Sequence, residues 1–192
     1  MMVNDGVSLE TESRMSLLPF STVDVFTRTR FGGNPLAVVL GGETLTDATM
    51  QAVAAEFNLS ETTFVLPPDD PAHTARIRIF NRTAEMAFAG HPMVGTAFVL
   101  AGMRPDLLEA SFEIPAGIVR VAIERDATGN PAGAEVEAPQ PLTIGETVPA
   151  EVVAGLLGLT PGDVVTAAHP PILAWVGNPY VIARLAPAAL SR

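Results

Sequence analysis

The 192-residue chain contains no cysteine, which excludes disulfide bonds, thiolate metal ligands, cysteine nucleophiles and thiol-based racemase chemistry. Basic residues are also few, since 11 Lys and Arg stand against 21 Asp and Glu and give a formal net charge of −10. A charge of this sign repels phosphate backbones and anionic lipid surfaces, so neither nucleic acid nor a membrane is an expected partner. An anionic small molecule would have to be held by local donors, because the overall field repels it.

Long hydrophobic runs are absent as well. No stretch has the uninterrupted apolar length that a membrane-spanning helix needs. The N-terminus lacks the basic start and apolar run of a secretory signal, and we expect residues 1–17 to form a disordered leader. With 48% hydrophobic residues, the rest of the chain is expected to fold as a globular protein, and the lack of cysteine fits a cytoplasmic location.

Familiar phosphate, metal and hydrolase motifs are missing too. The glycine pairs at 32–33 and 41–42 fit neither G-x-G-x-x-G nor the P-loop pattern, so they are interpreted as turn glycines. No second histidine or carboxylate lies at metal-ligand spacing from His91, His73 is expected to face solvent, and Ser60 lacks a G-x-S-x-G motif. We therefore expect no metal and no organic cofactor.

One acidic residue, Glu61, lies between a predicted helix and a predicted strand. Apolar residues recur at the i, i+3, i+4, i+7 spacing over 50–57, and Asn58 suits the left-handed residue that ends such a helix. The segment 62–66 is β-branched and aromatic, which predicts a strand. A carboxylate in the joint can be held rigidly and still face a cleft, where it is useful for proton transfer. A solvated loop glutamate is the alternative interpretation.

A second candidate site precedes another predicted helix. Apolar residues keep helical spacing over 94–101, and Pro92 suits the first helical position, so Gly90 and His91 are placed at the helix N-terminus. Backbone N–H groups there have no partner within the helix, and the helix dipole favours an anion. His91 could donate to a carboxylate or shuttle a proton. A cap or a buried structural hydrogen bond is the alternative for this lone histidine.

Four segments carry a resemblance to a known family. They are Val23-Asp24-Val25-Phe26, Gly33-Asn34-Pro35-Leu36-Ala37-Val38-Val39, Glu56-Phe57-Asn58-Leu59-Ser60-Glu61-Thr62-Thr63-Phe64 and Phe88-Ala89-Gly90-His91-Pro92. In this order and spacing they resemble the PhzF family, which is named for an isomerase of phenazine biosynthesis and is similar in fold to diaminopimelate epimerase. The resemblance is specific over residues 23–102 and looser afterwards. In two departures, Asn81-Arg82 replaces the usual Thr-Pro and Met93 stands where threonine is common; both are expected to tune the pocket.

The resemblance implies an α+β fold of two pseudo-symmetric lobes. Each lobe would be a mixed or antiparallel sheet wrapped around a central helix, with the active site between the lobes. It also implies that Glu61 is the catalytic acid and base, that Ser60, Gly90 and His91 bind the substrate, and that the protein is a homodimer.

The lobes are expected to divide the chain unequally. We assign 18–137 to the N-terminal lobe and 138–192 to the first part of the C-terminal lobe, with Ala138–Pro141 as the linker. The segment 177–183 weakly repeats 33–39 and is predicted to begin the second half. The family's other site motif does not follow it, so we expect an incomplete second lobe: either the chain is truncated, or a separate polypeptide supplies the remainder.

Two functions from different classes remain open. The first is a cofactor-independent isomerase that moves a proton on a small carboxylate-bearing metabolite, with Glu61 as general acid and base and its pKa raised by burial. The alternative is a non-catalytic small-molecule-binding or assembly protein, inactive because half of the cleft is absent. Deuterium entering the substrate from heavy water would distinguish the first from the second.

Overall fold

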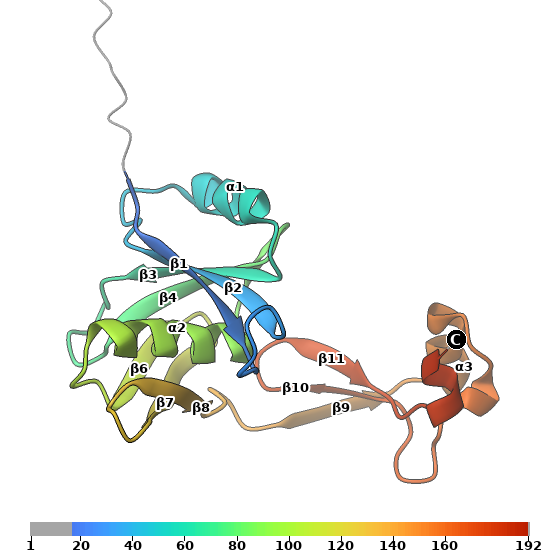
Figure 1. The fold of residues 1–192 in the computed structure, drawn as a ribbon. Helices are drawn as coiled ribbons and strands as arrows, with labels where there is room; N and C mark the ends of the chain where they lie inside the picture. Colours follow the sequence, from blue (N-terminus) through green and yellow to red (C-terminus); the bar gives the residue numbers. More distant parts are fainter. Residues whose placement is uncertain (1–16, 192) are drawn as a thin grey trace, which may run out of the picture.

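Two β-sheets organise residues 17–191, the part of the chain that the computed structural model describes (Figure 1). The first has eight strands in the order β1-β2-β3-β4-β6-β7-β8, and β5 pairs with β4. Its strands are β1 (Phe20–Val25), β2 (Asn34–Leu40), β3 (Glu61–Leu66), β4 (Ala75–Phe80), β5 (Glu85–Met86), β6 (Glu109–Ile114), β7 (Gly117–Arg125) and β8 (Pro131–Val136). The pairs β2–β3 and β4–β6 are parallel and the others antiparallel, so the sheet is mixed. The predicted leader, apart from Leu17, lies outside the described residues.

Helix α2 (Gly90–Met103) lies in the concave face of this sheet and contacts β1, β2, β3, β7 and β8 (Figure 1). Gly95 makes the close approach possible, because a Cβ at this position would lie 2.6 Å from the Leu36 side chain. Helix α1 (Asp47–Phe57) covers the opposite face, where its Met50 packs in one cluster with Phe64 of β3. The predicted mixed sheet around a central helix is therefore confirmed for this lobe.

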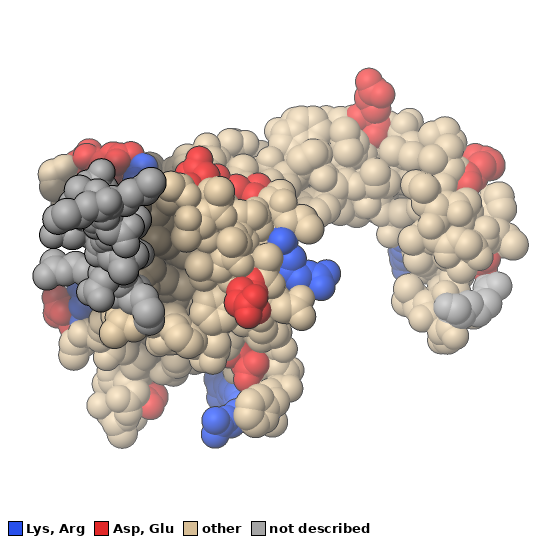
Figure 2. Space-filling model, turned by 90° about the horizontal axis from the view of Figure 1, so that it is seen from above, with Lys and Arg blue, Asp and Glu red and all other residues tan. Residues whose placement is uncertain are grey.

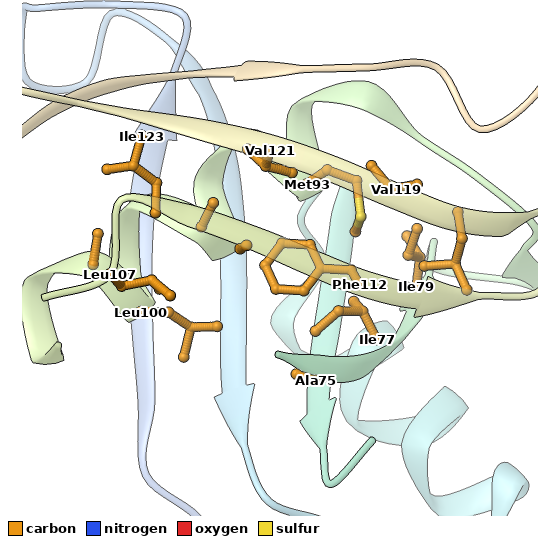
Figure 3. Packing of buried hydrophobic residues seen from close by; sticks show 14 residues of the cluster. Ala75, Ile77, Ile79, Met93, Leu100, Leu107, Phe112, Val119, Val121 and Ile123 are labelled. Atoms are coloured by element: carbon orange, nitrogen blue, oxygen red, sulfur yellow. The ribbon is translucent and has the colours of Figure 1, made fainter. Parts of the chain in front are cut away.

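The main core lies between α2 and the strands β4, β6 and β7 (Figure 3). It is a cluster of 14 buried hydrophobic residues, in which Phe112, Ile77 and Met93 are fully shielded from solvent. Burying side chains of this size is the main favourable contribution to folding. The core thus fixes α2 against the sheet and, with it, the position at which the helix begins.

The second sheet is smaller and extends away from the first (Figure 1). It has the antiparallel order β11-β10-β9, with β9 (Thr143–Thr147), β10 (Ile172–Trp175) and β11 (Pro179–Ile182). At its far end lie α3 (Ala150–Leu157) and the 3₁₀ helices η1 (Pro161–Asp163) and η2 (Pro187–Ser191). The hairpin β10–β11 matches the hairpin β1–β2 in that a Gly-Asn-Pro segment leads into its second strand, which supports the weak repeat. The lobe boundary at 138 stays a prediction.

The loop before β4 differs from what its sequence predicts. His73 is not a solvent-facing side chain: it is 24% exposed, and its Nδ1 lies 2.8 Å from Oε1 of Glu113 on β6. The Glu113 carboxylate also accepts the backbone N–H groups of Asp69 and Asp70, and these hydrogen bonds, with that of His73, lower its pKa to about 2. Three hydrogen bonds to Glu113 thus hold the loop against the sheet.

Acidic and basic side chains are both scattered over the face seen in Figure 2, and neither kind forms a large patch there. None of the helices within residues 17–191 combines the length and the apolar character needed to cross a membrane.

Candidate active site

The candidate site forms where two parallel strands begin. β2 and β3 are parallel neighbours, with Leu36 opposite Glu61, because α1 connects them and returns the chain to the same edge of the sheet. Side chains alternate between the two faces of a strand, so Glu61 shares a face with Thr63, whose Oγ1 lies 2.9 Å from Oγ1 of Thr96 on α2. Asn34, two residues before Leu36, faces α2 in the same way. Glu61 is therefore the first residue of β3 rather than a residue of the preceding joint.

Helix α2 begins beside these strand ends. Its N-cap is Ala89, which has no side chain that could accept a hydrogen bond, and Gly90 and His91 are its first two residues. Pro92 is the third helical residue rather than the predicted first, at a position where a missing N–H also removes no intrahelical bond. A Cβ built on Gly90 would meet no heavy atom within 4 Å, so the space next to the helix N-terminus is open. The positive end of the helix dipole faces this space.

Glu61 and His91, 30 positions apart in the chain, meet in this arrangement. The Glu61 Oε2 and His91 Nε2 atoms lie 3.1 Å apart, and the two side chains are only 15% and 8% exposed. Within residues 17–191 neither atom has a partner with proper hydrogen-bond geometry, so the two groups are close but not aligned. Catalytic groups often align only when a ligand is bound.

Burial changes the proton affinities of both groups. Loss of hydration raises the pKa of Glu61 above its usual 4.5 and lowers the pKa of His91 below its usual 6.5. In each case the neutral form is favoured, because a charge is poorly solvated at this position. Glu61 can thus exchange its proton closer to neutral pH than an exposed glutamate, and His91 stays an uncharged imidazole there.

A third residue orients the histidine. The Asn34 side-chain nitrogen lies 3.3 Å from Nδ1 of His91, and its Oδ1 accepts the Ser60 hydroxyl at 2.7 Å. An amide nitrogen can only donate, so Nδ1 accepts and the neutral ring carries its proton on Nε2, facing Glu61. Ser60, predicted to bind substrate, is exposed and orients Asn34 in this structure. The sequence interpretation missed Asn34 as a site residue, although its Gly-Asn-Pro motif occurs twice and could have indicated it.

A hollow of about 500 Å³ opens next to Glu61. It is lined by Asn58, Leu59, Ser60, Glu61, Asn81, Arg82, Thr83 and Met86. It forms because β4 runs antiparallel to β3, with Thr62 opposite Phe80, so the turn after Phe80 lies beside the start of β3. Of the four predicted site residues, Ser60 and Glu61 line the hollow, whereas His91 is connected to it through Glu61 and Gly90 is not among its lining residues.

The second sheet touches the segment that leads into α2. The Asn178 side-chain amide donates to the backbone carbonyl of Phe88 at 2.6 Å. The preceding Gly177 has a φ of +156°, and a Cβ there would lie 2.8 Å from Cβ of Phe88. The two Gly-Asn-Pro motifs therefore contact the same short segment, one at Phe88 and the other at His91.

No group of three or more His, Asp or Glu side chains in the described part of the chain is arranged to hold a metal ion.

The chain was compared with known protein families and with proteins of known name or structure. Residues 23–191 match the family described as phenazine biosynthesis-like protein, PhzC-PhzF. The chain belongs to the PhzF family. It is 44% identical over 161 residues to an uncharacterized isomerase of Mesorhizobium japonicum, which covers 82% of this chain and 53% of that protein. It is 39% identical over 137 residues to the trans-2,3-dihydro-3-hydroxyanthranilate isomerase of Pseudomonas aeruginosa, which covers 71% and 48%.

Solved structures agree with the PhzF assignment. A predicted epimerase from Pseudomonas aeruginosa superimposes with a TM-score of 0.78 at 31% identity and covers 90% of this chain and 61% of its own. A hydroxyproline epimerase from Agrobacterium vitis shares the fold alone, with a TM-score of 0.62 at 14% identity over 91% of this chain and 53% of its own. The predicted diaminopimelate epimerase-like α+β fold is confirmed. The chain spans about half the length of the curated PhzF relatives it matches.

Proposed function

We propose that this PhzF-family chain forms one wall of the active site of a cofactor-independent isomerase that moves a proton on a small carboxylate-bearing metabolite. The pairing of Glu61 with His91, both nearly buried and 3.1 Å apart at a helix N-terminus, is the observation that carries the proposal. The names of the relatives, which are isomerases and epimerases, support the reaction class.

In the proposed reaction, Glu61 acts first as a base and then as an acid. Its carboxylate takes a proton from a carbon next to an unsaturated or carboxyl-bearing group, and the electron pair of the broken C–H bond is delocalised over that group. The protonated Glu61, whose carboxyl hydrogen exchanges with solvent, then delivers a proton to another carbon of the delocalised system. No atom or electron is gained or lost, so the product is an isomer. The raised pKa of Glu61 suits both steps near neutral pH.

His91 and the start of α2 would stabilise the charge that develops. The Nε2–H of a neutral His91 can donate to the Glu61 carboxylate or to a substrate oxygen, and the free backbone N–H groups near Gly90 can hold an anionic group. Donors fixed in place before the reaction need no reorganisation during it. The open space beside Gly90 leaves room for such a group.

Deuterium incorporation tests the proposal. The purified protein, incubated in heavy water with trans-2,3-dihydro-3-hydroxyanthranilate and a panel of other small unsaturated carboxylates, should introduce solvent deuterium at carbon in at least one of them. Glu61→Gln should reduce incorporation at least about 100-fold, the usual contribution of a general acid–base group. The matched control is Glu109→Gln, at an exposed glutamate of β6.

The alternative hypothesis, a non-catalytic binding or assembly protein, predicts a different result in the same experiment. Ligand binding that survives Glu61→Gln, with no incorporation by the wild type for any carboxylate tested, would favour it and reject proton transfer. Incorporation that persists in the Glu61→Gln variant would show that a residue other than Glu61 transfers the proton.

A further inference from the structure

The hollow beside Glu61 contains one basic side chain that the proposed reaction does not use. Arg82 is exposed at the tip of the turn between β4 and β5, and among the described residues it is the only basic one that lines the hollow. The chain has no lysine, so guanidinium groups are its only permanently charged donors. Because the net charge of −10 repels anions, an anionic ligand at this site needs a local cation such as Arg82.

Arg82 has no acidic partner among residues 17–191. Within this part of the chain its only hydrogen bond is a long one, 3.3 Å, from Nη1 to the side-chain oxygen of Asn58. Arg78, on the strand before it, differs because it forms ion pairs with both Asp47 and Glu85. A guanidinium has five donors, so most of those of Arg82 remain available for a ligand.

The turn that carries Arg82 is firmly held. The Asn81 side-chain oxygen accepts the backbone N–H groups of Thr83 and Ala84, and the Asn81 N–H donates to the Ala84 carbonyl. The Asn81 carbonyl also accepts the Gln51 side chain of α1. A donor on a fixed turn loses less conformational entropy on binding than one on a flexible loop. The hydrogen-bonded turn thus holds the backbone of Arg82 in place beside the hollow.

Arg82 and Glu61 line the same hollow without forming a pair. The pKa of Glu61 is raised by burial, so the nearby cation does not hold it in the charged form. His91, the second residue of α2, lies 3.1 Å from Glu61, whereas Arg82 comes from the β4–β5 turn. A substrate at Glu61 therefore has two separate groups of anion-binding donors available to it.

We infer that Arg82 forms a subsite for a second anionic group, so that the substrate is a small diacid with one acidic group at the start of α2 and another, carboxylate or phosphate, at Arg82. This inference rests on the proposed function, because it concerns the substrate of the same site. A guanidinium suits either anion, since its parallel N–H groups match the oxygens of both.

Binding of matched probes tests the subsite without any turnover. Dicarboxylates from malonate to adipate are titrated into the purified protein and followed by NMR, and each is compared with its half-amide, which has the same length and one charge fewer. The wild type should prefer at least one dicarboxylate about tenfold, the size expected for a charge-assisted hydrogen bond. Arg82→Gln should abolish the preference, and Arg82→Lys should retain part of it. Arg120→Gln, on an exposed face of β7, should leave it unchanged.

A further probe identifies the anion. 3-Phosphonopropionate replaces one carboxylate of succinate by a phosphonate, so tighter binding than succinate that depends on Arg82 indicates a phosphate subsite, and weaker binding indicates a carboxylate subsite. A dicarboxylate preference that Arg82→Gln leaves intact, or no preference at any chain length, overturns the inference. Neither result affects deuterium incorporation by Glu61, and a failure of that incorporation leaves the Arg82-dependent preference measurable.

Discussion

Replacing Asn34 by aspartate should reverse the proton arrangement of His91. In the native site the Asn34 amide donates to Nδ1 at 3.3 Å, so the ring proton lies on Nε2 and faces Glu61. An aspartate at this position can only accept when it is ionised, so Nδ1 must carry a proton. His91 then either presents a bare Nε2 to the Glu61 carboxylate or becomes an imidazolium, and the pKa of His91 should rise because of the new negative charge.

The size of the effect follows from the contacts. One neutral hydrogen bond contributes about 1 kcal/mol, which favours one tautomer about fivefold, and a hydrogen bond to a charged group contributes about 1.5–3 kcal/mol. Asn34→Asp should therefore convert most of His91 from the Nε2–H to the Nδ1–H or doubly protonated form. If proton transfer depends on Nε2–H, the catalytic rate should fall about tenfold or more.

Imidazole ¹⁵N chemical shifts measure the tautomer directly. The chain has three histidines, so the His91 signals can be assigned by comparing the wild type with His73→Gln and His169→Gln. Asn178→Asp is the matched control, because Asn178 occupies the same motif but donates to the Phe88 carbonyl and not to a histidine. A wild-type ring with its proton on Nδ1, or an unchanged ring in Asn34→Asp, would refute the reasoning.

Two further predictions concern stability. Burial raises the pKa of Glu61, so the folded state favours the protonated carboxyl; the associated stability is complete below the unfolded pKa near 4.5 and is lost as the pH rises through the higher folded value. The Tm of Glu61→Gln should therefore exceed that of the wild type at pH 8 but not at pH 4, and a constant difference across this range in thermal melts would argue against it. Thr63 and Thr96 are fully buried and their hydroxyls lie 2.9 Å apart, so Thr96→Val should cost about 1–2 kcal/mol in urea unfolding by leaving Thr63 with a single long hydrogen bond. Adding Thr63→Val should recover part of that loss, whereas additive losses in the double variant would reject the coupling.

Local features of the chain could be predicted because their causes are local. The left-handed Asn58 at the end of α1, with a φ of 54°, follows from its residue type and the apolar spacing before it. That Glu61 and His91 belong to the same site was predicted from the family resemblance, because nothing in their immediate sequences relates two positions 30 residues apart. The structure then placed Asn34 against His91, which depends on the parallel pairing of β2 with β3 and is not encoded in any short segment.

The predictions that were wrong or missing concern contacts between residues that are far apart in the chain. His73 was expected to face solvent because its loop is polar, but Glu113 on a distant strand binds it. Arg125 was not singled out, yet its Nη2 donates to the carbonyls of Ala101 in the last turn of α2 and of Arg104 and Leu107 after the helix. Both side chains find their partners only after the sheet has formed.

The hydrogen bond from Asn178 to Phe88 links the second sheet to the segment that leads into α2. Its acceptor lies two residues before the first turn of α2, and Gly177 is in contact with the same phenylalanine. A rotation of β9–β11 about the connection between the sheets would pull on the backbone in front of Gly90. Such a rotation would therefore also shift the free N–H donors at the start of α2.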